Sequence, residues 1–431
     1  MLKRKIYDDL CIWKDKEKKK ALVVEGARQV GKTFIVEAFA RENYENIVFI
    51  NFVKSPRMAQ AFSGELDVDN ILTQLSVLIP DSRFVPGSTI IILDEVQLCP
   101  NAITALKFFS LDGRFDVIAT GSLLGMNYKE IASFPVGYIE RLEMHSLDLE
   151  EFFLANKIKP DVIKTLRVNF EKKKPVPEAI HERLMELFRE YIVVGGMPAA
   201  VSEYIETHHF GNVRKIQKDI VSDYLYDIAK YADGAEKTKA RECFLSIPNQ
   251  LSRDYKKFRY ATVDKHGSAR KYAGSLMWLL DADIISFCNN LERIELPLEG
   301  NVISDAFKVY MRDTGLLVSM LDEGAVADIL SGQLGIYKGA IYENIIADIF
   351  TKAGKKLYYY EYRSNIEMDF IIRFAGEATA VEVKSADHTK SKSMKALIDN
   401  YGVKQGVKLS SKNVGYINNV TTYPLYMAMF L

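Results

Sequence analysis

The stretch "ALVVEGARQVGKTF", residues 21–34, constrains the fold more than any other part of this sequence. Its first four residues are apolar and predict a short buried strand, whereas "TFIVEAFA" at 33–40 predicts a helix. The loop between them fits the pattern G-x-x-x-x-G-K-[ST], with its glycines at Gly26 and Gly31. A strand that passes through such a loop into a helix is typical of a parallel α/β sheet, so we expect an α/β fold.

The loop residues are of the types that bind phosphate groups. Glycines let backbone N–H groups turn toward an anion, and the N-terminus of the following helix adds partial positive charge. The lysine would reach the β- and γ-phosphates, and the threonine hydroxyl would be a ligand of Mg²⁺. We therefore predict that ATP or ADP, with Mg²⁺, binds to Gly26, Ala27, Arg28, Gln29, Val30, Gly31, Lys32 and Thr33.

Three more apolar runs, "NIVFINF", "STIIILDE" and "FDVIATGS", predict parallel strands that are covered on both faces. The second run ends in Asp94 and Glu95, and ligands of open α/β sheets bind at the carboxyl ends of strands. We expect Asp94 to hold Mg²⁺ and Glu95 to orient or deprotonate the attacking water, which favours hydrolysis over nucleotide storage. Thr120 and Ser122 end the third run and could sense the γ-phosphate, although small polar residues also simply end strands.

Composition limits the partners. Lys+Arg and Asp+Glu both count 57 among 431 residues, so any basic surface must be local. The four cysteines stand far apart, at Cys11, Cys99, Cys243 and Cys288. This spacing favours reduced thiols of the cytosol over a disulfide framework. The N-terminus lacks the apolar core of a signal peptide, and no apolar run approaches the ~18 residues of a membrane span. We expect a cytoplasmic protein with no membrane partner.

The chain divides into three parts by pattern. Strands alternate with helical patterns up to about residue 150, and a charged connector with several prolines follows. The next part is mainly helical, and the last hundred residues return to strands. We predict a nucleotide-binding domain with a helical lid at 1–210, a middle domain at 211–330 and an α/β domain at 331–431.

Several segments together carry a family resemblance. The phosphate-binding loop, "IIILDEVQ", "ATGSLLG", "FPVGYIERLEMHSLDLEEFF" and "YIVVGGMPAAV" resemble the prokaryotic AAA-type P-loop ATPases that carry a C-terminal DUF4143 domain, related to archaeal-type and STAND ATPases. The resemblance spans nearly the whole chain. It implies that Pro198 in Gly196-Met197-Pro198 packs near the adenine, although a helix end followed by proline explains the same residues.

The resemblance also implies an arginine that faces the developing phosphate charge. Arg141 and Arg28 are both candidates, and no spacing rule selects between them. Either arginine could equally form a structural ion pair. The resemblance leaves oligomerisation open.

For the middle domain, the resemblance implies a winged-helix-like fold. The segment 252–272 has seven basic residues with interleaved aromatic residues, which makes it the best candidate for a DNA-binding surface in a neutral chain. A solvated basic face, or a contact with the ATPase domain of the same chain, explains this composition as well.

The last domain contains "EMDFIIRFAGEATAVEVKS", which predicts two alternating strands that place Glu382 and Lys384 on one face. With Asp369 and Glu343, these residues are similar to the metal site of restriction-endonuclease-like (PD-(D/E)xK) domains. That resemblance implies that Glu343, Asp369 and Glu382 hold Mg²⁺ and that Lys384 is catalytic. Met368 stands where that motif has proline. An inert remnant of the fold with cross-strand ion pairs is the alternative.

The predicted protein is thus an α/β ATPase with a P-loop NTPase sheet, a helical subdomain, a winged-helix-like middle domain and a restriction-endonuclease-like C-terminal domain. Three functions follow from this organisation. The first is a DNA-processing ATPase with a working metal-dependent nuclease. The second is a nucleotide-switched regulatory or partner-docking protein with an inactive nuclease-like domain. The third is a nuclease that the ATPase gates.

Overall fold

A computed structural model describes residues 2–121, 135–231, 234–253, 256–333, 338–362, 366–384 and 392–431. The chain forms two compact units, Lys3–Ser146 and Leu147–Leu431. None of the described helices is long and apolar enough to cross a bilayer. The four cysteines are free thiols.

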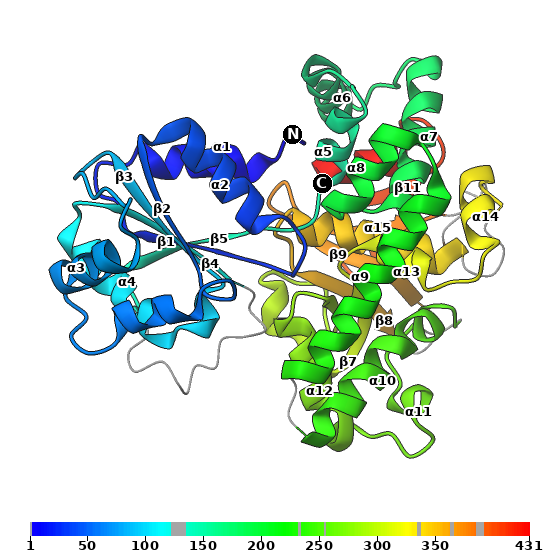
Figure 1. The fold of residues 1–431 in the computed structure, drawn as a ribbon. Helices are drawn as coiled ribbons and strands as arrows, with labels where there is room; N and C mark the ends of the chain where they lie inside the picture. The colour runs from blue at the N-terminus through cyan, green and yellow to red at the C-terminus, as the bar shows by residue number, and fades with distance from the viewer. Residues whose placement is uncertain are drawn as a thin grey trace. The chain divides into compact units, whose positions relative to one another are not determined.

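The first unit is built on a five-stranded parallel sheet with the strand order β2-β3-β4-β1-β5 (Figure 1). Its strands are β1 (Ala21–Glu25), β2 (Asn46–Asn51), β3 (Thr89–Asp94), β4 (Asp116–Gly121) and β5 (Ile139–Glu143). Its helices are α1 (Lys5–Lys14), α2 (Lys32–Asn43), α3 (Val68–Leu78) and α4 (Pro100–Asp112), with the 3-10 helices η1 (Pro56–Phe62) and η2 (Val96–Leu98).

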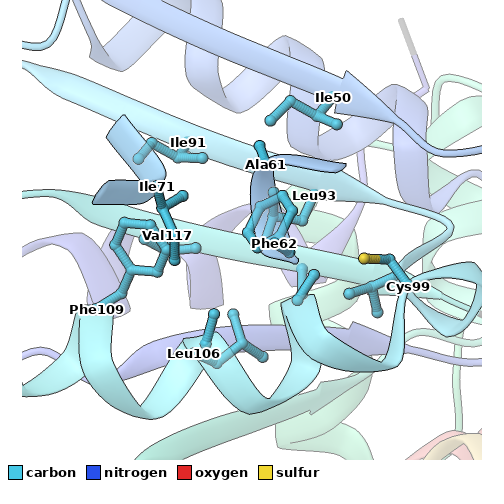
Figure 2. Close-up of a cluster of buried hydrophobic side chains, with 14 of the residues drawn as sticks. Ile50, Ala61, Phe62, Ile71, Ile91, Leu93, Cys99, Leu106, Phe109 and Val117 are labelled. Carbon is cyan, nitrogen blue, oxygen red and sulfur yellow. The ribbon is translucent and has the colours of Figure 1, made fainter. Parts of the chain in front are cut away.

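Separate hydrophobic clusters cover the two faces of this sheet. On one face, α1 and α2 bury Trp13 and Phe39 against side chains such as Ile92 of β3. On the other face, η1, α3 and α4 pack on the sheet, and Figure 2 shows Phe62 and Phe109 of this second cluster. Burial on both faces is why the strands read as continuous apolar runs in the sequence.

The second unit contains twelve described helices and one eight-stranded mixed sheet. The helices are α5 (Leu149–Ala155), α6 (Pro160–Glu171), α7 (Glu178–Val194), α8 (Pro198–Thr207), α9 (Phe210–Tyr231), α10 (Gly234–Leu251), α11 (Tyr260–Val263), α12 (Ala269–Asp281), α13 (Thr314–Ser319), α14 (Ala325–Ser331), α15 (Lys338–Lys352) and α16 (Lys392–Asn400). Two more 3-10 helices are η4 (Leu298–Asn301) and η6 (Leu425–Phe430). The strands are β6 (Ile285–Leu291), β7 (Val302–Met311), β8 (Leu357–Tyr362), β9 (Ile366–Phe374), β10 (Glu377–Val383), β11 (Gly406–Ser410), β12 (Gly415–Ile417) and β13 (Val420–Pro424).

This sheet runs across the predicted boundary at 330/331. Its strand order is β12-β13-β11-β10-β9-β8-β6-β7, and β6 pairs in parallel with β8, with Cys288 opposite Leu357. The hairpin of β6 and β7 therefore belongs to the same sheet as the C-terminal strands. By its contacts, the helical segment that begins at Leu147 groups with the second unit, although the prediction assigned it to the first domain.

Candidate functional site

The phosphate-binding loop lies between β1 and α2, and its backbone needs glycine. Gly26 has a φ of +149°, and a Cβ at this position would lie 2.1 Å from the carbonyl oxygen of Met144. Gly31, with a φ of +96°, immediately precedes α2. Gln29 also has a positive φ, 64°, so the loop makes successive turns that expose backbone N–H groups.

Two basic side chains bond to carbonyl groups of this loop. Lys32 Nζ donates to Gly26 O at 3.0 Å and to Ala27 O at 2.7 Å, so its ammonium group lies against the loop. Arg4 is buried just before α1 and donates to Val30 O at 3.1 Å and to His145 O at 2.6 Å. Arg4 therefore ties the loop to the segment after β5. No sequence pattern points to Arg4, because a lone arginine in a charged N-terminus is not distinguishable from its neighbours.

Asp94 is the centre of a hydrogen-bonded cluster at the carboxyl ends of three neighbouring strands and the start of α2. Its side chain is 2% exposed and accepts hydrogen bonds from Thr33 Oγ1 at 2.9 Å, from Asn51 Nδ2 at 2.5 Å and from Thr120 Oγ1. Thr33 and Asp94, the two predicted magnesium ligands of this unit, are thus in direct contact. Asn51 was not predicted, and the strand order that brings it beside Asp94 is its only signal.

Glu95 follows Asp94 in a left-handed backbone conformation with a φ of 56°. Its Oε2 accepts a hydrogen bond from Gln97 Nε2 at 2.6 Å. Gln97 is buried, and its Oε1 accepts no hydrogen bond from the described residues. A Cβ at Gly121 would lie 2.6 Å from this oxygen, so glycine leaves room for the amide. Ser122 lies outside the described residues.

The predicted arginine contacts and the predicted adenine contact stay predictions. Arg141 Nη1 lies 3.7 Å from Glu25 Oε1 in a partly exposed ion pair, and Arg28 is half-buried in the loop. Pro198 begins α8 in the second unit. In the same unit, the preceding Gly196 donates its N–H to Asp313 Oδ2 at 2.8 Å, which gives the glycine pair a structural role.

In the second unit, Glu343 lies in a buried cluster of charges. Its carboxylate contacts the ammonium groups of Lys256 and, at 3.7 Å, Lys308, and accepts a hydrogen bond from Tyr310 at 3.1 Å. Burial by itself would raise the pKa of Glu343, but the ammonium groups of Lys308 and Lys256 outweigh it and hold the pKa below its ordinary value. Glu343 is therefore ionised and fully paired.

The other three predicted nuclease residues lie on β9, on β10 and just after β10. Asp369 is half-buried, and its Oδ2 accepts the backbone N–H of Val383 at 2.7 Å. Burial and the charge of Glu343 raise the pKa of Asp369 above its ordinary value. Lys384 Nζ lies 2.6 Å from Glu382 Oε1, whereas Glu382 Oε2 is buried and has no hydrogen-bond partner among the described residues.

These contacts do not fit a bound metal ion as the side chains stand. Lys256 already neutralises Glu343, and Lys384 already neutralises Glu382. A divalent cation needs the same carboxylate oxygens, and placing it beside two ammonium groups costs electrostatic energy. The closed pair of Lys384 with Glu382 is the arrangement expected of the inert alternative.

The basic segment 252–272 points partly inward. Lys256 is only 14% exposed, and Phe258 is buried with its ring 5.9 Å from that of Phe307. Lys271 pairs with Asp264 at 2.5 Å. The remaining described basic side chains of the segment are exposed, namely Arg253, Lys257, Arg259, Lys265 and Arg270.

Three protein-family models match separate parts of the chain. Residues 18–153 match an AAA domain, residues 185–326 match the domain of unknown function DUF8612, and residues 338–426 match the domain of unknown function DUF4143. The predicted family resemblance is confirmed, and so is the predicted α/β class with a P-loop sheet and an additional C-terminal sheet. Among curated proteins, no match was found.

Three archaeal proteins are among the solved structures to which this chain is similar. A Walker-type ATPase of Pyrococcus abyssi shares 14% identity over 74% of this chain and 96% of its own, with a TM-score of 0.43. The Orc1 protein of Aeropyrum pernix, in complex with DNA, shares 14% identity over 76% of this chain and 90% of its own, with a TM-score of 0.30. A STAND protein of Pyrococcus horikoshii shares 14% identity over 82% of this chain and 45% of its own, with a TM-score of 0.27.

Proposed function

Because the chain carries an AAA-type P-loop ATPase domain followed by a DUF4143 domain, we propose that it hydrolyses ATP and uses the nucleotide state to control a DNA-binding second unit. The observation that carries the ATPase part is the cluster around Asp94. A P-loop threonine and a strand-end aspartate within 2.9 Å of each other are the pair that P-loop ATPases use for Mg²⁺.

Each residue of this cluster has a proposed role. Backbone N–H groups of the loop and the ammonium group of Lys32 bind the phosphate groups. Thr33 and Asp94 would hold Mg²⁺, which when bound neutralises charge on the phosphate oxygens. Glu95 would accept a proton from the attacking water, once its carboxylate leaves the hydrogen bond to Gln97.

The DNA-binding part of the proposal rests on the middle of the chain. Helices α10, α11 and α12 are followed by the antiparallel hairpin of β6 and β7, which is the element order of a winged helix. Arg270 lies in the first turn of α12 and is exposed, as are Lys257 and Arg259 before α11. Phosphate contacts from such residues give sequence-independent affinity that falls with salt.

For the C-terminal domain, predicted at 331–431, we propose that the described conformation has no nuclease activity. The observation that favours it is the pairing of two of the three predicted metal ligands, Glu343 and Glu382, with lysines of the chain itself. The module would then act as a docking or regulatory domain, and cleavage of DNA would require the cluster to open.

One set of measurements tests the ATPase. Lys32→Ala is expected to lose tight MgATP binding, whereas Glu95→Gln is expected to bind ATP and stall. Turnover is measured with and without single- and double-stranded DNA, while the DNA is examined for cuts in Mg²⁺ or Mn²⁺. Wild-type turnover by Glu95→Gln would remove the proposed role of Glu95.

A separate measurement tests DNA binding. Replacing the exposed Lys257, Arg259 and Arg270 by glutamate should weaken binding and flatten its salt dependence. Lys16→Glu in the first unit serves as the control for a general change of charge. An unchanged salt slope in the triple variant would mean that α12 and its flanks do not contact DNA.

A further inference from the structure

One face of the C-terminal sheet is only partly covered by α16. The buried side chains of this helix pack on β9 and β10, where Leu397 belongs to the same hydrophobic cluster as Ala380. Strands β11, β13 and β12 continue the sheet past β10 to its edge. A groove of about 860 Å³ lies between α16 and these outer strands, within the range of about 300–1,000 Å³ that is typical of ligand sites.

The floor of this groove is aliphatic. Ile417 of β12 is opposite Val420 of β13, and paired residues of neighbouring strands point to the same face of a sheet. Met394 and Ile398 of α16 line the other wall, and none of the described residues that line the groove is aromatic. Tyr416, next to Ile417, points to the opposite face because successive side chains of a strand alternate. The groove therefore offers aliphatic contacts, including Ile417, whose side chain is 73% exposed.

Lysines surround this floor. Lys395, Lys408 and Lys412 line the groove, against one acidic residue, Asp399. Lys395 and Lys412 are exposed, and neither forms an ion pair with another described residue. Their positive charge is therefore directed to solvent at the rim of an aliphatic groove.

The connector after α6 brings more positive charge to the same edge of the sheet. Asn413, which also lines the groove, accepts the N–H of Val176 at 2.9 Å and donates to the Val176 carbonyl oxygen at 2.7 Å. Lys173 Nζ lies 4.4 Å from the centre of the Tyr416 ring. The run 172–174 consists of three exposed lysines. This edge of the second unit thus carries excess positive charge, although the charges of the whole chain balance.

We propose that the groove docks an acidic segment of a partner protein, with an aliphatic side chain on the floor and carboxylates against the lysines. Charge complementarity favours an acidic partner. The aliphatic floor favours a peptide over a nucleic acid, because bases stack on aromatic side chains. Strand β12 is three residues long, so a strand added at this edge would form few backbone bonds, and side-chain contacts must supply the affinity. The inference names the partner class for the docking role proposed for the C-terminal domain, and it rests on that role.

Fluorescence anisotropy of a synthetic peptide tests the docking site. The probe is a short fluorescein-labelled peptide of alternating glutamate and isoleucine, which is titrated with the full-length protein. We expect wild type to bind this peptide, and to bind it more weakly as the salt concentration rises. A peptide with lysine in place of glutamate should not bind. A peptide with serine in place of isoleucine should bind about tenfold more weakly.

Substitutions assign the binding to the groove. The double variant Lys395→Glu and Lys412→Glu reverses charge at the rim, and Ile417→Asp places a charge on the floor without removing a buried side chain. Each should weaken binding of the acidic peptide by about tenfold or more. Lys215→Glu and Ile12→Asp, at exposed positions elsewhere, should bind like wild type. The unfolding temperature and ATP turnover of each variant show whether it is folded.

Four results would overturn the proposal. The acidic peptide might bind no more tightly than its lysine counterpart, or bind equally well to both groove variants. Fluorescein-labelled oligothymidine might bind more tightly than the peptide and lose affinity in the double lysine variant, which would assign the groove to nucleic acid. Sedimentation might show that wild type self-associates and that Ile417→Asp is monomeric, which would assign the groove to a second copy of the chain.

The outcome is separable from that of the proposed function. ATP turnover is measured on the same preparations, and DNA binding is tested with the variant at Lys257, Arg259 and Arg270. Failure of peptide binding with both of these intact would remove only the docking site.

Discussion

Asn51 offers the sharpest test of how the nucleotide site is held. It ends β2 and donates from Nδ2 to Asp94 Oδ2 at 2.5 Å, while its own Oδ1 accepts the N–H groups of Val53 and Lys54. Asn51→Asp keeps the acceptor for the turn and replaces the donor by a carboxylate oxygen. The substitution thus isolates the contact with Asp94, whereas Asn51→Ala removes both contacts.

The structure gives the expected size of the effect. A hydrogen bond to a charged group contributes about 1.5–3 kcal/mol, so its loss in Asn51→Ala should lower kcat/KM by about 10- to 150-fold. We expect a decrease near the lower end of this range, because Thr33 and Thr120 still donate hydrogen bonds to the other carboxylate oxygen of Asp94. In Asn51→Asp, two carboxylates ~3 Å apart would repel by roughly 5 kcal/mol at an effective dielectric constant near 20, so one of them takes up a proton.

The assay is steady-state ATP turnover against pH and Mg²⁺ concentration. Asn51→Asp is expected to be at least as impaired as Asn51→Ala at pH 7 and to recover partly at higher pH and Mg²⁺, which Asn51→Ala should not do. Asn46→Asp, at the opposite end of β2, is the control. A wild-type kcat/KM in Asn51→Asp, or the same pH profile in both variants, would refute the reasoning.

Three further predictions concern other parts of the chain. Gly26→Ala places a Cβ 2.1 Å from Met144 O, so we expect titrations with ATP to show no tight binding. Arg4→Ala removes two bonds to carbonyl groups and should raise KM for ATP about tenfold, whereas the exposed Arg41→Ala should not; equal KM values for all three proteins would contradict this. Burial raises the pKa of Asp348 to about 6, so the folded state binds this proton more tightly than the unfolded chain does. The contribution of Asp348 to the free energy of unfolding therefore falls as the pH rises from about 4 to 6. Relative to Asp348→Asn, wild type should lose roughly 3 kcal/mol over that window, and parallel denaturation curves at both pH values would exclude the effect.

The nucleotide site could be predicted to the extent that it is local in sequence. Residues 26–33 are contiguous, in the loop and the first turn of α2, and Asp94 and Glu95 stand at the end of a continuous apolar run. Asn51 could not be predicted, because an asparagine at the end of a strand is typical of a turn, and only the neighbouring positions of β2 and β3 give it a second role. Arg4 was missed for the same reason, since its acceptors are 26 and 141 residues away.

The charged cluster around Glu343 was also only partly predictable from the sequence. The residue types and the alternation that places Glu382 and Lys384 together were readable in the sequence. The basic composition of 252–272 predicts that Lys256 lies on a basic surface. In the structure, Lys256 instead pairs with Glu343, which lies 87 residues further along the chain. No local pattern distinguishes a lysine that faces solvent from one that neutralises a distant buried carboxylate.

The parallel pairing of β6 with β8 limits where the C-terminal sheet can be separated from the rest of the chain. The DUF4143 match begins at residue 338, after the hairpin that pairs with β8. A fragment cut there would leave β8 as a bare edge whose free N–H and C=O groups invite pairing with other chains. We expect such a fragment to aggregate unless the hairpin is supplied, so recombination between genes would have to carry residues 285–311 together with the rest of the sheet.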